Sequence, residues 1–236
     1  MIKGIYYAAR SLNNGFKKMS NIANNLANIN TNGYKREIPF SEVMMSKGNS
    51  RLTQFTDFSA GSLVKTASPL DLAISGSGFF VVQTPKGNEL TRNGHFQISD
   101  DGFLVDGNGN KLMGLKGAIN LNDFLFDDEN KKLKILRNGE IRVGNKAVDN
   151  LLIMQADNPL SLQRDSNLDF ISLTDDYMPV DENNFQVLQG YLEESNVNPI
   201  VEMEAMIKTS SDYQSSYKMV NFLDQSLQKA NEVGRV

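Results

Sequence analysis

Few residues in this chain of 236 amino acids could act as a nucleophile, a metal ligand or a general acid. The chain has no cysteine, which excludes a thiolate nucleophile, a disulfide framework and a cysteine-ligated zinc site. Its single histidine, His95, cannot form a histidine-based metal cluster within one chain. A Ser-His-Asp triad would need this residue, but no Gly-x-Ser-x-Gly elbow lies near it. We therefore interpret His95 as a surface or turn residue.

Two glycine-containing segments resemble ligand-binding loops but lack decisive positions. The run Asp106–Asn110 begins like a calcium loop, yet Lys111 stands at the sixth position, which requires glycine, and Gly117 at the twelfth, which requires glutamate. A hairpin turn is the better interpretation. Gly76-Ser77-Gly78 lacks the third glycine of a dinucleotide-binding fingerprint, so it predicts a bulge or a tight bend in a strand.

The acidic residues fit a solvated surface better than a catalytic site. Glu193-Glu194 and Asp127-Asp128-Glu129 could supply paired carboxylates, but adjacent acids in turn-rich segments usually face solvent. The sequence thus predicts no catalytic residue, no metal site, no cofactor and no small-molecule substrate, and we do not expect an enzyme. The net charge of −4 gives no general attraction to nucleic acid, and no run of 18 apolar residues predicts a membrane-spanning helix.

Apolar residues near the N-terminus recur at the spacing of a helix. Ile5, Leu12, Met19 and Leu26 recur every seven residues. The apolar residues that flank this line are Phe16, Ile22 and Ile29. This spacing predicts an amphipathic helix over residues 3–30. Asn30–Gly33 ends it, because Gly33 suits the left-handed conformation that follows many helices.

A second helix is predicted at the C-terminus. Pro199 suits a first helical position, and either Ser195 or Asn198 could cap the helix. The main line of residues seven apart is Met206, Tyr213, Val220 and Leu227. A second, imperfect line follows Met203, Ser210, Tyr217 and Asp224. Together these lines predict a helix over residues 199–231.

Between the helices the pattern changes to that of short strands. Residues 36–68 show little periodicity, and we expect an extended connector there with one short strand. From residue 69 onward, short apolar runs alternate with Asn-Gly and Asp-Gly turns, which predicts hairpins. The expected organisation is a helix at 1–35, a connector at 36–68, a central β domain at 69–189 and a second helix at 190–236.

The two ends carry opposite charge and apolar stripes that need partners. Residues 1–36 contain six basic and no acidic residues, whereas residues 190–236 contain four basic and seven acidic residues. The expected fold is α+β, with the N- and C-terminal helices pairing as a coiled coil beside a central all-β domain of short antiparallel strands. The aromatic residues left outside that pair are Tyr6, Tyr7, Tyr217 and Phe222. We therefore expect other copies to complete the burial, so the apolar positions of both helices are the predicted assembly interface.

Three segments add a resemblance to a known family. They are ANNLANINTNGYK at 23–35, PLDLAISGSGFFVV at 69–82 with TRNGHF and DGFLV after it, and QGYLEESNVN at 189–198. Together they are similar to bacterial flagellar basal-body rod proteins of the rod/hook axial family, of proximal or distal type. The residues that carry the resemblance are Asn24, Asn25, Leu26, Asn28, Gly33, Tyr34, Gly76, Gly78, Phe79, Phe80, Gly190, Ser195, Asn196 and Asn198.

The resemblance implies a structural subunit rather than an enzyme. Such subunits polymerise helically, with copies of themselves and other rod or hook proteins, into the torque-transmitting shaft of the basal body. Their terminal helices form an inner coiled-coil layer that lines the channel. The resemblance also implies passage through the flagellar type III export apparatus into the periplasm-spanning rod without a cleaved signal peptide. Arg10 agrees with this, because it interrupts the apolar run that a cleaved signal would need.

Two other functions stay open from the residues alone. A carbohydrate- or peptide-binding β module with helical dimerisation arms would show a concave aromatic cluster and closed dimers. A secreted hydrolase that uses His95 would place a serine and an aspartate beside it.

Overall fold

The computed structural model describes residues 2–39, 54–122, 132–159, 162–165, 169–172, 177–181 and 183–233. The chain forms two compact units. The helical unit comprises Met1–Ile29, Arg36–Asp57 and Val197–Val236, and the β unit comprises Asn30–Lys35 and Phe58–Asn196.

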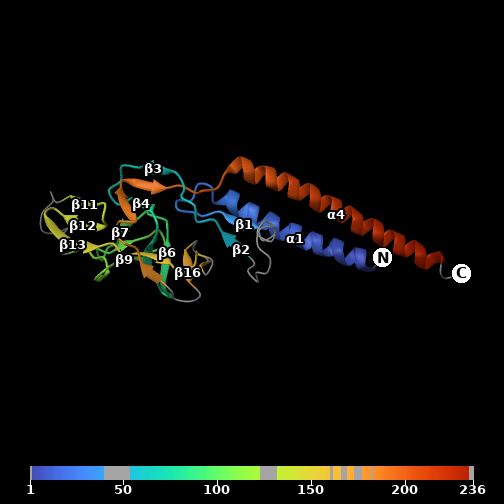
Figure 1. Ribbon diagram of the computed structural model, residues 1–236, viewed down its shortest axis with the longest axis horizontal. Coiled ribbons are helices and arrows are strands. Elements are labelled where there is room, and N and C mark those ends of the chain that lie inside the picture. Colours follow the sequence, from blue (N-terminus) through green and yellow to red (C-terminus); the bar gives the residue numbers. More distant parts are fainter. Residues whose placement is uncertain are drawn as a thin grey trace. The chain divides into compact units, whose positions relative to one another are not determined.

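The helical unit is built on two long helices, α1 (Ile2–Ala27) and α4 (Pro199–Val233). Both match the predicted spans closely, so the prediction of a helix at each end of the described chain is confirmed. Within this unit the helices lie side by side and run antiparallel (Figure 1). A short antiparallel pair, β1 (Glu37–Pro39) with β2 (Gln54–Thr56), completes the unit.

The β unit consists of many short strands (Figure 1). They are β3 (Leu63–Lys65), β4 (Leu72–Gly76), β5 (Phe79–Thr84), β6 (Gly87–Thr91), β7 (Gln97–Ile98), β8 (Leu104–Val105), β9 (Lys111–Gly114), β10 (Gly117–Ala118), β11 (Leu133–Ile135), β12 (Glu140–Val143), β13 (Lys146–Asn150), β14 (Ile153–Ala156), β15 (Leu162–Arg164), β16 (Phe170–Ser172), β17 (Tyr177–Pro179), β18 (Phe185–Gln189) and β19 (Tyr191–Glu193). Every pairing among the described strands is antiparallel, which confirms the all-β prediction for the centre of the chain.

The strand β5 is central to the β unit because both of its faces are buried. Phe80 and Val82 belong to one apolar cluster and Phe79 and Val81 to another. Successive side chains of a strand point to opposite faces, so the unbroken apolar run of β5 supplies both cores. β5 pairs with β6, β9 and β14.

The turn chemistry read from the sequence is confirmed in two hairpins. Asn138-Gly139 joins β11 to β12, and Gly139 has a φ of 88°. The run Asp106–Asn110 joins β8 to β9, and the Asp106 carboxylate accepts hydrogen bonds from the backbone N–H groups of Asn108 and Asn110. This carboxylate is fully engaged in the turn, as the hairpin interpretation requires.

The segment 36–68 contains more structure than the sequence predicted. Instead of one short strand it holds β1, β2 and β3 among its described residues. The sequence gives little signal for these strands, because each has only three residues and forms by pairing with another strand: β1 pairs with β2 inside the segment. β3 pairs with β19, about 130 residues later in the chain.

Candidate assembly surface

Small residues of α1 take part in its contact with α4. The Ser11 and Ser216 hydroxyl oxygens lie 3.1 Å apart. A Cβ atom placed on Gly4 would lie 3.6 Å from Leu223, and one on Gly15 would lie 3.5 Å from Tyr213. These three residues are seven and four positions apart, or about two turns and one turn of helix, so they lie along one line of α1 that faces α4.

The predicted interface residues differ widely in exposure. Ile22 is fully buried, at 1%, whereas Phe16 is 67% exposed and Tyr213 36%. Those that are half-buried are Leu12, Met19, Leu26, Ile29, Met206, Val220 and Leu227. The side chain of Ile5 lies outside the described residues. The structure therefore brings part of the predicted set together within one chain, and its role in contacts between copies stays a prediction.

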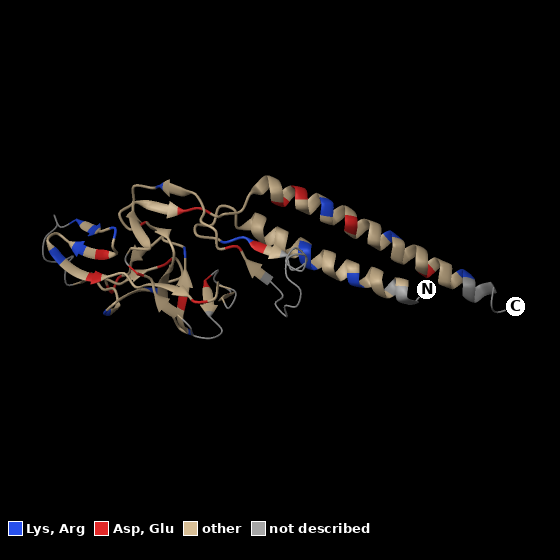
Figure 2. Ribbon diagram, viewed as in Figure 1, with Lys and Arg blue, Asp and Glu red and all other residues tan. Residues whose placement is uncertain are grey.

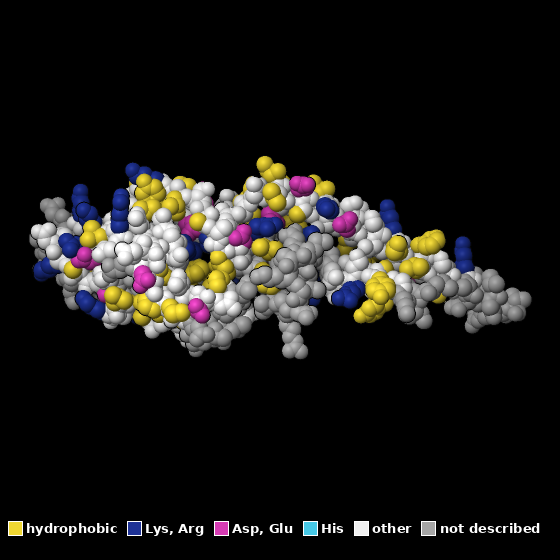
Figure 3. All heavy atoms as spheres, viewed as in Figure 1, with side chains coloured by type: hydrophobic (Ala, Val, Ile, Leu, Met, Phe, Trp, Pro, Cys, Tyr) yellow, Lys and Arg dark blue, Asp and Glu magenta, His cyan; other side chains and the backbone are white. Residues whose placement is uncertain are grey.

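Large apolar side chains protrude from both helices (Figure 3). Tyr6 and Tyr7 are each 65% exposed on α1, and the expected outer residues of α4 are exposed too, Tyr217 at 54% and Phe222 at 68%. Four further apolar residues of α4 are exposed that were not predicted to be: Ile200, Met203, Ile207 and Met219. The signal was present, because Ile200, Met203 and Ile207 fall on one face of a helix at a spacing of three and four.

The opposite charges of the chain ends produce an ion pair inside the helical unit. Arg36 Nε lies 2.5 Å from Glu202 Oε1, and Glu202 is only 1% exposed. The charged residues of α1 are all basic, whereas α4 carries both signs (Figure 2). The predicted attraction between the basic and the acidic end is thus confirmed at this pair.

The asparagines near the end of α1 act within the chain. Asn25, which is fully buried, donates from Nδ2 to the Glu37 carbonyl and accepts from the Glu37 N–H, both at 2.9 Å. Asn28 donates to the Asn24 carbonyl at 2.9 Å. At α4, Asn198 Oδ1 caps the helix by accepting from the Ile200 N–H at 3.0 Å. Of the two predicted caps, Asn198 is therefore the one used.

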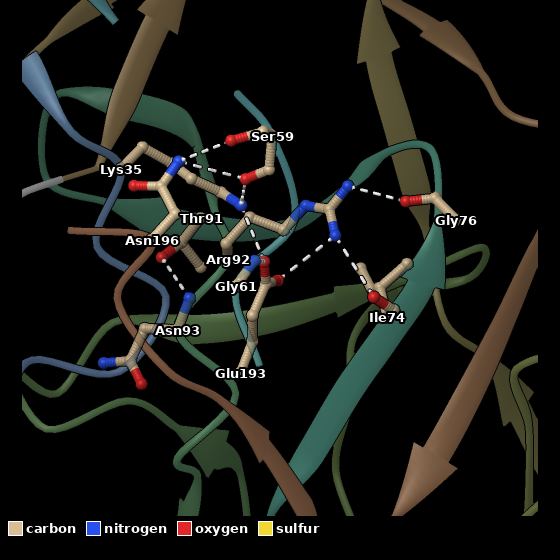
Figure 4. Close-up of polar contacts among 10 residues, drawn as sticks. All are labelled: Lys35, Ser59, Gly61, Ile74, Gly76, Thr91, Arg92, Asn93, Glu193 and Asn196. Atoms are coloured by element: carbon tan, nitrogen blue, oxygen red, sulfur yellow. Dashed lines mark hydrogen bonds and ion pairs between the residues drawn. The ribbon is translucent and has the colours of Figure 1, made fainter. Parts of the chain in front are cut away.

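A buried ion cluster lies in the β unit (Figure 4). Lys35 Nζ lies 2.6 Å from Glu193 Oε1, and Arg92 Nη1 lies 3.2 Å from Glu193 Oε2. The exposures of Lys35, Glu193 and Arg92 are 1%, 1% and 7%. The cluster therefore holds two cations and one carboxylate away from water.

Backbone groups complete this cluster. Lys35 Nζ donates to the Ser59 carbonyl at 2.7 Å, and the Gly61 N–H donates to Glu193 Oε1 at 2.9 Å. Arg92 also donates to the carbonyls of Ile74 and Gly76, at 3.2 and 2.8 Å. Burial lowers the pKa of the Arg92 guanidinium from its ordinary value, and the neighbouring carboxylate of Glu193 opposes that shift.

The interpretation of Glu193-Glu194 as a solvated pair is wrong for Glu193. Glu193 is the last residue of β19, which pairs with β3, and it is buried, whereas Glu194 follows the strand and is exposed. Two adjacent acids in a sequence do not reveal that one of them meets Lys35 and Arg92, which are distant in the chain. The other predicted acidic run, 127–129, lies outside the described residues.

His95, the only histidine of the sequence, lies at the surface of the β unit. His95 is 59% exposed, as a surface residue should be, and its Nδ1 lies 2.8 Å from the Asp71 carboxylate. Across the ranges that the structure describes, no group of three or more histidine, aspartate or glutamate residues could hold a metal ion. Within the same ranges, neither helix is long and apolar enough to cross a membrane.

Comparison with known proteins finds two parts of the chain similar to flagellar proteins. Residues 73–143 match the flagellar hook protein FlgE/F/G D1 domain, and residues 188–233 match the flagellar basal body rod FlgEFG protein C-terminal domain. The chain is 30% identical to the flagellar basal-body rod protein FlgF of Rhizobium meliloti, over 98% of each chain. It is also 30% identical to FlgG of Buchnera aphidicola subsp. Baizongia pistaciae, over 97% of this chain and 98% of the relative, and to FlgF of Caulobacter vibrioides, over 93% of each.

The chain belongs to the flagellar basal-body rod protein family. The buried cluster draws one residue from each of the three segments that first suggested this family. Lys35 ends the first segment, Arg92 lies in the continuation of the second, and Glu193 lies in the third. Residues far apart in this rod-family sequence thus meet at one point of the β unit (Figure 4).

The remaining family residues surround this point or shape the strands. Gly33 has a φ of 69°, and a Cβ atom there would lie 2.3 Å from the Arg92 backbone. Tyr34, 3% exposed, lies under the Arg164 guanidinium, 4.2 Å from its ring centre. Asn196 donates to the Ser59 carbonyl at 3.1 Å. The others are Gly76, Gly78 and Gly190, which all have positive φ, the buried Phe79 and Phe80, and the half-buried Ser195.

Proposed function

We propose that this chain is a structural subunit of the bacterial flagellar basal-body rod, and not an enzyme. It would assemble helically through α1 and α4 with copies of itself and with other rod or hook proteins, as part of the torque-transmitting shaft. Family membership over nearly the full chain carries this proposal. The apolar side chains exposed on both helices support it, because a helix pair that buries so few of its large residues needs further partners.

The assembly mechanism follows from the contacts of the helical unit. Burial of exposed apolar side chains supplies most of the association free energy, at about 25 cal/mol per Å² of apolar surface. Exposed ion pairs add only about 0–1 kcal/mol each, so charge selects the register rather than the affinity. Coiled-coil packing of α1 and α4, with the helices forming an inner layer around a channel, is part of the proposal.

Export through the flagellar type III apparatus without a cleaved signal peptide is proposed as well. The support is that residues 2–27 form α1, whose contacts with Tyr213 and Ser216 would be lost with the segment. Mass spectrometry of the N-terminal peptide from isolated basal bodies tests this. An intact N-terminus is expected, whereas a start beyond α1 would refute it.

Isolated basal bodies test the main proposal. An epitope-tagged chain is expected in the rod fraction, and a tagged chain that ends at Asn196 is expected to be absent from it. The shorter chain keeps every residue of the β unit but lacks α4, so it controls for folding of that unit. Normal basal bodies that lack the full-length chain would overturn the proposed function.

A further inference from the structure

Two buried carboxylates lie on one face of neighbouring strands in the β unit. Glu89 belongs to β6, and Asp169 immediately precedes β16, which pairs antiparallel with β6. The register of that pairing places Asp169 opposite Thr91. Glu89 and Thr91 are two residues apart on β6, and residues two apart on a strand point to the same face. Glu89 and Asp169 are therefore diagonal neighbours on one face, at a separation that long side chains can span.

Each of these carboxylates has one oxygen atom without a partner. Glu89 Oε1 accepts a hydrogen bond from the Thr84 hydroxyl at 2.9 Å. The Asp169 carboxylate accepts one from the Thr91 hydroxyl. Glu89 Oε2 and Asp169 Oδ2 have no hydrogen-bond partner among the residues that the structure describes, although the two residues are only 2% and 4% exposed. Because a buried oxygen without a partner is unfavourable, these two atoms point to a ligand between the strands.

Basic residues do not offset the charge of this pair. Within the described ranges, neither Glu89 nor Asp169 forms an ion pair with a lysine, arginine or histidine. The Lys86 ammonium lies near enough to feel the charge of Glu89, but it is exposed and pairs with Asp165 at 2.8 Å. Two carboxylates buried in this way require a compensating positive charge or a proton.

A third buried acid nearby is already occupied. Asp106 is 4% exposed, and its negative charge acts on Asp169. Its Oδ1 accepts from the backbone N–H groups of Asn108 and Asn110, and its Oδ2 accepts from the Asn110 amide. Asp106 therefore adds negative potential to this region without offering an oxygen atom for a further ligand.

We propose that Glu89 and Asp169 bind one divalent cation of the class that prefers oxygen ligands, with calcium as the ion that fits best. A charge of two cancels both carboxylates, whereas a monovalent ion would leave one of them uncompensated. Calcium accepts irregular arrangements of carboxylate and neutral oxygens, whereas magnesium requires near-octahedral geometry and keeps several waters, for which a buried position leaves little room. The Thr84 and Thr91 hydroxyls could add neutral oxygens.

This site differs from the acidic clusters that usually mark a metal centre. It uses two carboxylates, whereas the described ranges hold no suitable group of three or more acidic residues or histidines. A cation there would join β6 to β16, whose described register contains a single residue pair, Phe170 with Leu90. The cation would thus strengthen a weak connection in the sheet. The inference goes beyond the proposed function and does not depend on it.

Protons should compete with the cation for this site. Burial raises the pKa of Asp169 to about 6, the Thr91 hydroxyl opposes the shift, and the carboxylates of Asp106, Glu89 and Asp165 add to it. Below pH 6 the cation must therefore displace a proton from Asp169. The affinity for calcium is expected to be about tenfold lower at pH 5 than at pH 7.

Calorimetric titration of the full-length protein with calcium chloride tests the site directly. The protein is first treated with a chelator, and the titration is done at pH 7 and at pH 5. One calcium ion per chain is expected at pH 7, and Glu89→Gln and Asp169→Asn should each abolish its binding. Asp100→Asn is the control, because Asp100 is exposed in the turn between β7 and β8, and it should bind calcium like the parent protein.

Thermal unfolding shows whether the bound ion stabilises the β unit. Calcium at about 100 times its dissociation constant should raise the midpoint at pH 7 by about 5 °C or more. Sodium chloride at the same ionic strength should not. Asp169→Asn should unfold at a higher temperature than the parent protein when a chelator is present, which shows that its loss of calcium binding is not a loss of folding.

Three outcomes would overturn the inference. Absence of both binding and stabilisation would show that a proton or a buried water satisfies the two oxygens instead. Binding that persists in Glu89→Gln and Asp169→Asn would place calcium on acidic residues elsewhere. An affinity that does not fall between pH 7 and pH 5 would show that Asp169 is not a ligand. The proposed function would stand in each case, because it is tested by the tagged chain in isolated basal bodies.

Discussion

Glu193 is the residue on which the buried cluster depends, because its carboxylate pairs with both Lys35 and Arg92. Removing one partner of a buried ion pair leaves charge without compensation, which costs about 3–5 kcal/mol. We expect Glu193→Ala to lower the free energy of unfolding by about this amount, measured by urea denaturation. Glu194→Ala, at the exposed neighbouring position, is the control and should change it by less than about 0.5 kcal/mol. Equal effects would refute this role of Glu193.

Asp169 makes the stability of the β unit depend on pH. Burial raises the pKa of this carboxyl to about 6, the carboxylates of Asp106 and Glu89 add to the shift, and the hydroxyl of Thr91 opposes it. Asp169 is 4% exposed, and its Oδ2 has no hydrogen-bond partner among the residues that the structure describes. The folded protein therefore favours the neutral carboxyl of Asp169 more strongly than the unfolded chain does.

The sign of the pH dependence follows from this raised pKa. Between about pH 4 and pH 6 the folded protein keeps a proton that the unfolded chain has lost, so stability falls as the pH rises through this range. A difference of about two pKa units corresponds to about 3 kcal/mol, lost in full above pH 6. Asp169→Asn should therefore match the parent protein at pH 4 and exceed its stability at pH 7, measured by urea denaturation. A difference that does not change with pH would contradict the assignment.

At the scale of the element, Gly15 tests how α1 and α4 pack. Glycine inside a helix costs about 1 kcal/mol relative to alanine, and an alanine Cβ here would be in ordinary contact with Tyr213, at 3.5 Å. Gly15→Ala should therefore raise the midpoint of thermal unfolding followed by helical circular dichroism. Gly15→Leu should lower it, because the larger side chain would push against Tyr213 and separate the helices. Stabilisation by leucine as well would show that the ring does not pack there.

The elements that could be predicted from the sequence are those whose signal is local. The period of seven predicts both helices, and Asn138-Gly139 predicts its hairpin, because helix spacing and turn chemistry are properties of neighbouring residues. The side of α1 that meets α4 was not predictable, since a period does not say which line faces which partner. Here the small residues Ser11 and Gly15 make that contact.

The buried cluster could not be predicted for a related reason. Lys35, Arg92 and Glu193 are separated by long stretches of chain, and each is a residue type that is ordinarily exposed. They meet only once the chain has folded and β19 has paired with β3. The family resemblance identified the three segments that hold these residues. A sequence motif does not show, however, which of its residues are in contact in the folded protein.

At the scale of the whole molecule, the chain closes the β unit with residues from both of its ends. Asn30–Lys35 and the stretch up to Asn196 belong to this unit, and the Asn196 N–H donates to the Tyr34 carbonyl at 3.3 Å. The Gly33 N–H likewise donates to the Glu193 carbonyl at 2.7 Å. The two segments that lead toward the helical unit are thus joined to each other inside the β unit.

This closure predicts where the chain can be cut. A fragment of residues 30–196 keeps Lys35, Arg92 and Glu193, whereas residues 30–189 lack β19 and so remove the Glu193 carboxylate from the two buried cations. The longer fragment should fold and unfold cooperatively in urea with dispersed amide resonances. The shorter one should be less stable by at least about 3 kcal/mol, or unfolded.

A peptide of residues 190–198 supplies the missing strand in a second experiment. Adding it to the shorter fragment should recover the dispersed amide resonances, whereas the same peptide carrying Glu193→Gln should not. Equal stability of the two fragments would show that the β unit does not need its closing strand.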